Sequence, residues 1–310
     1  MTVRDVKASQ TPTPNPSPQG GGEIAGLLHR ARQALAEKGN PTPALDARLL
    51  LQQAAGLGHE ALIADPKRLI APDVAARFQA FLARRLAGEP VARILGEREF
   101  YGRAFKITRA TLDPRPDTET LIEAALALMP ADRACRIIDL GTGSGIIGVT
   151  LLAERPEAEA VMTDISAEAL AVARENAGRH GVLGRSAFIQ GSWFAGVEGR
   201  FDLVLSNPPY IPQAILPTLA PEVRNFDPEA ALVGGPDGLQ PYREIARMAA
   251  PFLVPQGRLI LEIGEGQAPE IEEIFVSCDW APEGRWRDLA GHVRDLGFSH
   301  AGPRQKRGWK

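Results

Sequence analysis

The chain has 310 residues, of which 44% are hydrophobic and 24% are charged, and its formal net charge is −3. These values are ordinary for one large or two modest globular domains, and the slight acidity excludes a protein that coats nucleic acid by charge alone. We expect no membrane span and no secretory signal. The two cysteines lie far apart, and the five histidines lack metal-ligand spacing. We therefore expect a cytoplasmic protein with reduced thiols and no metal.

The first ninety residues divide by composition. Residues 1–22 are rich in Pro and Gly and are expected to form a disordered tail. From 23 to 90, apolar residues such as Ile24, Leu27 and Ala31 recur at helical spacing. This pattern predicts a small all-helical domain without strands or a cofactor motif, whose role would be recognition of a protein substrate. Residues 91–112 are expected to be a short extended linker.

Strands and helices alternate from residue 113 to residue 310, which predicts an α/β domain of Rossmann-like type around a mostly parallel sheet. The predicted strands are 136–140, 160–164, 187–190, 203–206 and 258–263, and the predicted helices are 145–155 and 167–180. Ser166 is expected to cap the second helix because its hydroxyl can accept a free N–H of the first turn.

A glycine-rich loop, Asp-Leu-Gly-Thr-Gly-Ser-Gly at 139–145, follows the first predicted strand. Glycines let a ligand approach the backbone, and the next helix offers free N–H donors. Asp164, at the end of the second strand, can accept hydrogen bonds from ribose hydroxyls. NAD-dependent dehydrogenases and S-adenosylmethionine enzymes both fit this pattern. Asp139 favours the latter, because a carboxylate there can meet a cationic amino group.

The motif Asn207-Pro208-Pro209-Tyr210, at the end of the strand 203–206, is the most informative feature of the chain. The side-chain carbonyl of Asn207 and the backbone carbonyl of Pro208 can hold both hydrogens of a planar NH2 group and aim its lone pair. The prolines restrict the backbone, and Tyr210 offers a flat packing face. A simple turn is the alternative. After a nucleotide loop, the motif instead indicates alkylation of a planar nitrogen.

These motifs and six further segments resemble the bacterial release-factor glutamine methyltransferases, the HemK or PrmC family. The further segments are Leu-Asp-Ala-Arg-Leu-Leu at 45–50, Arg-Arg-x-x-Gly-Glu-Pro at 84–90, Gly-Glu-Arg-Glu-Phe-Tyr-Gly at 96–102, Pro-Arg-Pro-Asp-Thr-Glu at 114–119, Gly-Pro-Asp-Gly-Leu at 235–239 and Glu-Ile-Gly at 262–264. The resemblance covers residues 45 to about 300. Its most specific part is Arg-Pro-Asp-Thr-Glu together with the helical domain.

The resemblance implies a cofactor, a substrate and their sites. S-adenosylmethionine would be bound by Gly141, Thr142, Gly143, Ser144, Gly145, Asp164 on the ribose, Trp193 near the adenine, and Asn207. The substrate would be the glutamine of a Gly-Gly-Gln loop in class I peptide release factors, held by Asn207, Pro208, Pro209 and Tyr210. No direct binding of nucleic acid or membrane is expected. Phe100 and the segment 114–119 should close over the cofactor.

The sequence departs from the family pattern at three places, none of which removes a reacting group. Ser192 replaces a frequent acidic residue before Trp193, Asp113 replaces an apolar residue, and Arg93-Ile94-Leu95 replaces a Tyr-Leu-Thr run. Three other functions share parts of this pattern. A DNA adenine methyltransferase is disfavoured by the acidic charge and by the lack of an evident target-recognition insertion. The Asn-Pro-Pro-Tyr motif disfavours a dehydrogenase and a non-catalytic regulator that only binds the cofactor.

Overall fold

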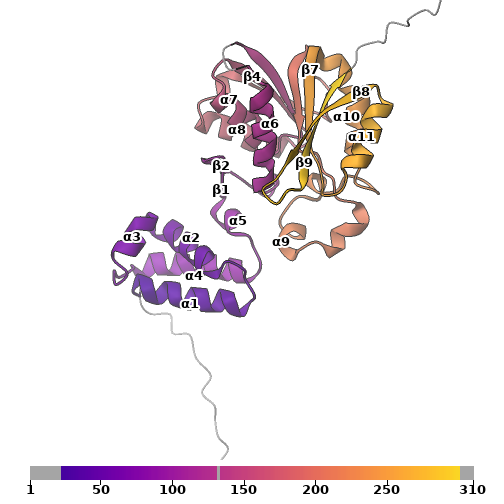
Figure 1. Ribbon diagram of the computed structural model, residues 1–310. Coiled ribbons are helices and arrows are strands. Elements are labelled where there is room, and N and C mark those ends of the chain that lie inside the picture. The colour runs from indigo at the N-terminus through magenta and orange to yellow at the C-terminus, as the bar shows by residue number, and fades with distance from the viewer. Residues whose placement is uncertain (1–21, 131–132, 301–310) are drawn as a thin grey trace, which may run out of the picture. The chain divides into compact units, whose positions relative to one another are not determined.

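The computed structural model describes residues 22–130 and 133–300 (Figure 1). The chain divides into two units, Met1–Ala87 and Gly88–Lys310, each with its own core. Apart from Gly22, the segment that was expected to be a disordered tail lies outside the described residues. In the described part of the chain, no helix combines the length and apolarity that a bilayer crossing requires.

The first unit is built from helices, as its apolar spacing predicts (Figure 1). They are α1 (Ile24–Glu37), α2 (Pro43–Ala55), α3 (His59–Ala64) and α4 (Pro72–Leu86). Pro43 and Pro72 each stand in a first helical turn, where the missing N–H is no loss. Gly56 ends α2 in the left-handed conformation. Leu50 and Phe78 are fully buried between the helices.

A buried ion pair joins α2 to α4 inside this unit. Arg85 donates from Nε to Asp46 Oδ2 at 2.6 Å, and both side chains are less than a tenth exposed. The same carboxylate accepts from Asn40 Nδ2 at 2.7 Å and from Thr42 Oγ1 at 2.9 Å. Buried charges persist when they are paired in this way. Asp46 and Arg85 lie in the segments 45–50 and 84–90, which resemble the family pattern, so these two segments have a structural role.

The second unit begins with a short helix and a hairpin rather than with extended chain alone. The elements are α5 (Val91–Leu95), β1 (Glu97–Phe100) and β2 (Arg103–Lys106). Gly96 takes the left-handed conformation that lets the chain turn after α5. The backbone of Lys106 exchanges two hydrogen bonds with the side chain of Asn176 on α8 (Ala167–Arg179), at 2.8 and 3.0 Å. The segment that we expected to be a linker is thus docked on the α/β unit.

Seven strands form the central sheet in the order β5-β4-β3-β6-β7-β9-β8. They are β3 (Cys135–Leu140), β4 (Ala158–Asp164), β5 (Ser186–Gln190), β6 (Phe201–Ser206), β7 (Leu253–Glu262), β8 (Trp280–Arg287) and β9 (Val293–His300). The first five in this order are parallel, which confirms the predicted fold class. The last two, which were not predicted, are antiparallel. The strand order reverses beside β3, a place where parallel sheets commonly bind ligands.

Helices cover both faces of this sheet (Figure 1). The longer ones are α6 (Glu119–Leu128), α7 (Ile146–Glu154), α8 (Ala167–Arg179), α10 (Gln240–Met248) and α11 (Ala268–Ser277). The short ones are η1 (Pro116–Thr118), η2 (Leu183–Arg185), η3 (Gln213–Thr218), α9 (Pro221–Arg224), η4 (Glu229–Ala231) and η5 (Ala250–Phe252). The site lies at the strand ends between these layers.

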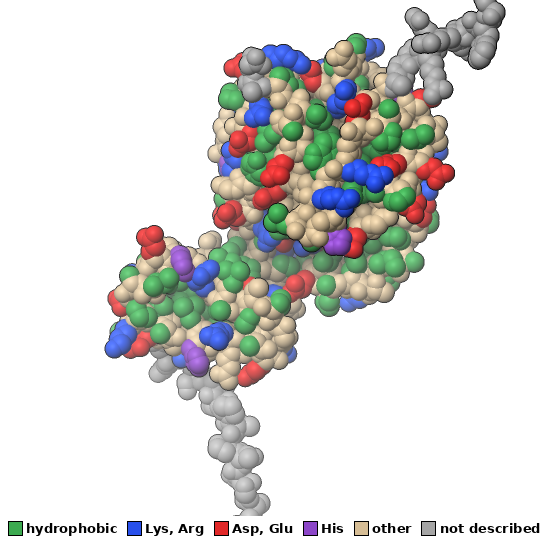
Figure 2. All heavy atoms as spheres, in the orientation of Figure 1, with side chains coloured by type: hydrophobic (Ala, Val, Ile, Leu, Met, Phe, Trp, Pro, Cys, Tyr) green, Lys and Arg blue, Asp and Glu red, His purple; other side chains and the backbone are tan. Residues whose placement is uncertain are grey.

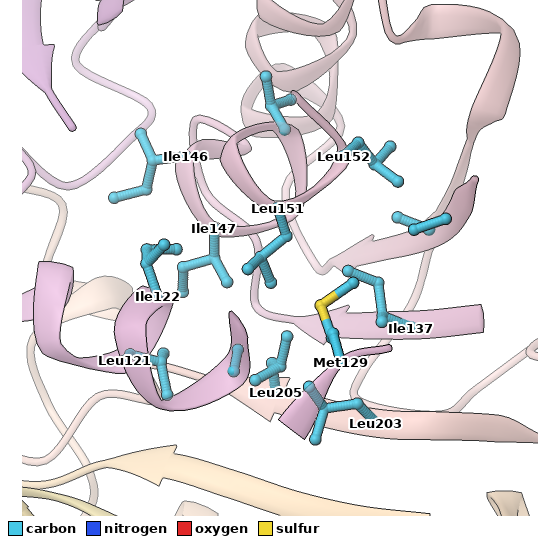
Figure 3. Close-up of a cluster of buried hydrophobic side chains, with 14 of the residues drawn as sticks. Leu121, Ile122, Met129, Ile137, Ile146, Ile147, Leu151, Leu152, Leu203 and Leu205 are labelled. Atoms are coloured by element: carbon cyan, nitrogen blue, oxygen red, sulfur yellow. The ribbon is translucent and has the colours of Figure 1, made fainter. Parts of the chain in front are cut away.

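Alternation along the strands divides the core in two, because successive side chains point to opposite faces. Ile137, Leu203 and Leu205 face α6 and α7, where Figure 3 shows them with Leu121 and Leu151. The intervening residues, such as Ile138 and Val204, face α10 and α11. An apolar cluster on each face packs the strands against the helices, so the strand ends are held by both layers. This packing fixes the positions of the loops that follow them.

Candidate functional site

The loops after β3 and β6 meet at the carboxyl edge of the sheet. Leu140 is paired with Ser206 in the parallel register, and the Ser206 hydroxyl donates to the Leu140 carbonyl at 2.7 Å. The glycine-rich loop begins directly after Leu140, and Asn207 directly follows Ser206. The sheet therefore brings together the two motifs that the sequence analysis singled out, although they are far apart along the chain.

Asp139 supports the loop from below. Its carboxylate accepts hydrogen bonds from the Thr142 hydroxyl and, at 3.2 Å, from the Gly148 N–H. The side chain is fully buried, and burial raises its pKa to about 6. Asp139 does not line the neighbouring cavity. Its direct contact with a cofactor amino group stays a prediction, while its support of the loop is visible in these bonds.

Glycines in the loop have two different uses. Gly141 and Gly143 line the cavity with φ of +67° and +56°, a conformation that strains any other residue. A Cβ on Gly145 would lie 3.0 Å from the Ala173 Cβ, and one on Gly148 would lie 2.6 Å from the Met162 Cε. The first pair leaves backbone open to a ligand, whereas the second pair lets α7 pack closely.

Asp164 ends β4 at the edge of the same loop. Its two carboxylate oxygens accept from the backbone N–H groups of Gly143 and Ser166, each at 2.9 Å. The Ser166 hydroxyl accepts from the Ala169 N–H at 3.1 Å, which confirms the predicted helix cap. Asp164 also lines the cavity, so its carboxylate is available to hydroxyl groups there.

Trp193 lies against the loop from the opposite side. It is a non-glycine residue with a φ of +50°, and strain of this kind collects at binding sites. Its Nε1 donates to Glu244 Oε2 at 2.5 Å, and Gln240 holds the other oxygen of that carboxylate at 2.9 Å. Trp193, Ser192 and Glu244 all line the cavity. Glu244, which the sequence analysis did not name, therefore brings an acidic group to the region beside Ser192.

A cavity of about 570 Å³ connects these residues. Of the predicted site residues, those that line it are Gly141, Thr142, Gly143, Ser144, Asp164, Trp193, Asn207 and Pro209. Thr118 and Pro114 from the segment 114–119 line it as well. Left-handed glycines, a carboxylate at a strand end and an aromatic ring suit a nucleoside that carries a charged tail. The cavity therefore fits S-adenosylmethionine in size and in the types of group that it presents.

Phe100 does not reach this cavity. It is 2% exposed and packs against Phe105 with ring centroids 6.2 Å apart. The expectation that Phe100 closes over the cofactor was therefore wrong, because the hairpin β1–β2 turns this ring into the core of the unit.

The side chain of Asn207 lies beside two groups that the sequence analysis did not assign. Its Nδ2 donates to Thr118 Oγ1 at 3.3 Å, and it lies across the strand ends from Glu262 on β7, whose pKa it lowers. Burial raises the pKa of Glu262 to about 7. The sequence indicated only that Glu262 stands at the end of a predicted strand. Residue spacing does not predict which other strand lies beside that strand, so the contact with Asn207 could not be predicted.

The rest of the Asn-Pro-Pro-Tyr motif is fixed from behind. Pro208 is buried, and the Tyr210 carbonyl accepts from Gln267 Nε2 at 3.1 Å. Burial, with a smaller effect from Glu262, raises the pKa of Tyr210 to about 12, so its phenol keeps its proton. Pro208 and Tyr210 do not line the cavity. Their contacts with a substrate stay predictions.

A buried ion cluster ties together two segments of the cavity rim. Asp227 accepts from Arg93 Nη2 at 2.5 Å, from Arg115 Nη2 at 2.8 Å and from the Asp113 N–H at 3.2 Å. Arg93 and Asp113 are two of the positions at which the sequence departs from the resembling family. The Arg93 side chain thus helps to hold the rim, whereas Asp113 contacts Asp227 through its backbone N–H, a bond that its side chain does not determine.

Two family descriptions match the chain. Residues 26–96 match the PrmC N-terminal domain, and residues 116–218 match the methyltransferase small domain. Among solved structures, the hMettl16 catalytic domain, in complex with an RNA hairpin, is 16% identical with a TM-score of 0.53, and covers 73% of this chain and 81% of its own. A Pyrococcus furiosus methyltransferase is 17% identical with a TM-score of 0.50, and covers 71% and 96%. At this identity the likeness shows the fold alone.

The relatives with higher identity decide the family. A release factor glutamine methyltransferase from Agrobacterium fabrum is 44% identical over 90% of this chain and 99% of its own length. Another, from Cereibacter sphaeroides, is 48% identical over 87% and 96%. The dehydrogenase and non-catalytic alternatives are thereby excluded. The chain is an S-adenosylmethionine-dependent methyltransferase and belongs to the release factor glutamine methyltransferase family.

Proposed function

We propose that this enzyme methylates the side-chain amide nitrogen of the glutamine in the Gly-Gly-Gln loop of class I peptide release factors. One observation carries the proposal. The amide NH2 of Asn207 donates to Thr118 and Asn207 lines the cavity, so its carbonyl oxygen is the group left to accept from a substrate. A carbonyl acceptor beside a cofactor cavity is what a planar NH2 substrate requires. The family membership supplies the identity of that substrate.

The cofactor would be held by the residues that line the cavity. Gly141 and Gly143 would lie against it through their backbone, Asp164 would accept from its ribose hydroxyls, and Trp193 would pack near its adenine. When bound, S-adenosylmethionine supplies a methyl group on a positively charged sulfur that leaves as a neutral thioether. No metal is needed for such a transfer, because the sulfonium carries its own activation.

The task of the protein side chains is alignment. The Asn207 carbonyl and the Pro208 backbone carbonyl would each accept one hydrogen of the glutamine amide, so that the nitrogen lone pair points at the methyl carbon. Both hydrogen bonds strengthen as positive charge develops on the nitrogen, which stabilises the transition state more than the ground state. The product nitrogen then loses a proton, for which water is a sufficient acceptor. Tyr210 is not a base at neutral pH, since its phenol stays protonated.

The helical unit would select the protein substrate. The described residues that line the cavity all belong to the second unit, so the first supplies none of the cofactor site. A Gly-Gly-Gln loop alone presents little surface for discrimination, and a separate recognition unit would extend the contact. The proposed place of action is the cytoplasm, where release factors meet ribosomes. On the face shown in Figure 2, acidic and basic side chains are interspersed, which supports a protein substrate rather than DNA.

The experiment that tests the proposal follows the methyl group. The protein is incubated with labelled S-adenosylmethionine and, separately, with a release factor, a ribosomal protein and duplex DNA. We expect label on the release factor, and peptide mapping should place it on the glutamine of the Gly-Gly-Gln loop. A release factor in which that glutamine is replaced by alanine is the control and should stay unlabelled. Label on DNA or on the ribosomal protein alone would contradict the proposal.

A further inference from the structure

Three side chains from separate elements lie together behind the proposed substrate site. Asn207 follows β6 and Glu262 ends β7, and these parallel strands are paired with Ser206 opposite Leu261. Asn207 and Glu262 are therefore the next positions across the same edge. Thr118, from η1, completes the group: its hydroxyl accepts from Asn207 Nδ2 at 3.3 Å, and both side chains lower the pKa of the neighbouring Glu262 carboxyl.

The chemistry of these groups gives their arrangement a direction. An ionised carboxylate only accepts hydrogen bonds, whereas a hydroxyl has one hydrogen to donate. Thr118 turns a lone pair to Asn207, which leaves its own hydrogen to point toward the Glu262 carboxylate. Because Nδ2 donates to Thr118 and Glu262 is the next position across the strand ends, half a turn of the Asn207 amide would lose the donor contact and bring Oδ1 toward a carboxylate. Its Oδ1 is thereby kept on the side of the cavity.

This arrangement is unfavourable for stability, which indicates that it serves another purpose. Glu262 is 2% exposed, and among the described residues its Oε2 has no hydrogen-bond partner. Asp295 is paired with it across β9, is fully buried, and has no partner for either oxygen within the same described set. Half-satisfied buried carboxyls cost more than apolar residues of the same size. Strain of this type persists where function requires it.

We propose that Glu262 and Thr118 are positioning residues for methyl transfer, which hold the amide of Asn207 with its carbonyl oxygen toward the substrate nitrogen. The inference rests on the proposed function, because it assigns the way in which that function's key acceptor is oriented. Neither residue is proposed to touch the reacting atoms through its carboxylate or hydroxyl. Both act through Asn207.

The constraint depends on the ionisation of Glu262. Burial raises its pKa to about 7, with hydrogen bonds from Thr118 and Asn207 acting against the rise. The titratable and charged groups that face it are Asp295 and Arg294 on β9, Asp117 on η1, Tyr210 after β6, and Tyr242 on α10. Once protonated, Glu262 can donate as well as accept, and the arrangement loses its fixed direction. We therefore expect kcat to rise with pH across the region near 7.

Four variants test the inference, with kcat, KM for the release factor, cofactor affinity by calorimetry and melting temperature as readouts between pH 6 and 9. Thr118→Val keeps the shape but removes the hydroxyl, and Thr118→Ser restores it. Glu262→Gln keeps the size but can turn either end of its amide to Thr118. Asp295→Asn changes the neighbouring buried carboxyl, which has no contact with Asn207, and is the matched control.

We expect Thr118→Val and Glu262→Gln to lower kcat by about tenfold or more at pH 8, with KM and cofactor affinity little changed. Thr118→Ser should recover most of kcat, Glu262→Gln should abolish the rise in kcat near pH 7, and Asp295→Asn should keep the kcat of the unaltered enzyme at pH 8. If Glu262→Gln does not fold, the comparison of Thr118→Val with Thr118→Ser decides. Undiminished kcat in Thr118→Val with an unchanged pH profile would overturn the inference, as would an equal loss in Asp295→Asn. An unaltered enzyme that does not methylate release factor would overturn the proposed function, and the inference with it.

Discussion

The two units bury carboxylates in opposite ways. In the helical unit, Asp46 meets Arg85, Asn40 and Thr42, so its charge is compensated by three donors. In the α/β unit, Glu262 and Asp295 lie side by side across β7 and β9, and three of their four oxygens have no hydrogen-bond partner among the described residues. Burial raises their pKa values to about 7 and about 9, and repulsion from Glu262 adds to the rise at Asp295.

The difference separates a buried charge that stabilises the fold, that of Asp46, from one that is proposed to orient a site residue, that of Glu262. Removing a partner from a compensated buried pair leaves a bare charge, so Asp46 should matter for stability. Asp295 has no hydrogen-bond partner for its carboxyl among the described residues. Replacing this carboxyl removes an unfavourable buried group, so Asp295 should lower the stability of the fold. Asn207 and Asp164 lie between these extremes, because each makes internal bonds and also faces the cavity. Variants of these four residues compare the effects on stability, turnover and cofactor binding.

The largest effect is expected from Asp46→Ala, which leaves Arg85 buried without its carboxylate. The free energy of unfolding of the helical unit should fall by about 3–5 kcal/mol. Urea denaturation with a probe in this unit measures it. Asp73→Ala is the matched control, since the Asp73–Arg77 pair is exposed and 3.7 Å long, and it should cost about 1 kcal/mol or less. Equal losses in both variants would show that the buried pair contributes no more to the free energy of unfolding than the exposed pair does.

Asn207→Ala should lower kcat by on the order of a hundredfold or more, because the substrate nitrogen loses the acceptor that aims its lone pair. Cofactor affinity by calorimetry should be retained. Single-turnover methylation of release factor measures the chemical step. Asn225→Ala, at an exposed asparagine of the same unit, should leave the rate unchanged.

Asn207→Asp is the sharper variant at the same position. It keeps the size and an acceptor but places a desolvated carboxylate next to Glu262, so we expect strong impairment as well. Single-turnover rates close to those of the unaltered enzyme in both Asn207 variants would reduce this residue to a turn former.

Asp164→Ala should weaken S-adenosylmethionine binding by about ten- to hundredfold, the equivalent of about 1.5–3 kcal/mol for a charge-assisted hydrogen bond. The same change frees the N–H groups of Gly143 and Ser166, so Asp164→Asn is needed to separate charge from loop support. Calorimetric titration measures both. Glu159→Ala, on the exposed side of β4, is the control and should bind normally; unchanged affinity in Asp164→Ala would reject the ribose assignment.

The smallest effect is expected from Asp295→Asn, and its sign is opposite to that of Asp46→Ala. The pKa of Asp295 is raised from 3.8 to about 9, so the folded state binds this proton more tightly than the unfolded state. The contribution of Asp295 to stability is therefore largest below about pH 4 and is lost as the pH rises toward 9. Asp295→Asn removes this loss and should be more stable by about 1 kcal/mol or more at pH 8, since one pKa unit corresponds to about 1.4 kcal/mol. Urea denaturation at pH 5 and pH 8 measures it, and parallel pH curves for the two proteins would contradict the expected burial.

Local pattern was sufficient for the fold class and for both motifs. The strands that carry the glycine loop and Asn207 were predicted because buried parallel strands are short apolar runs. The helix cap at Ser166 was predicted because a cap acts on N–H groups within three residues. The antiparallel strands β8 and β9 were missed, since β8 alternates with charged residues and ends in a long exposed turn. The helix α5 was missed because five residues carry almost no periodicity.

The arrangement around Asn207 was decided by tertiary structure. Thr118, Asn207 and Glu262 come from three elements separated by 89 and 55 residues, and they meet only because β6 and β7 are neighbours and η1 lies at their ends. Local periodicity determines which face of an element is buried, but not which strand ends become adjacent, because that depends on the connections between strands. The sequence alone therefore determined the family, the cofactor and the reacting motif. The placement of Phe100 in the core, the packing role of Gly145 and the buried carboxyls behind Asn207 followed from the folded chain.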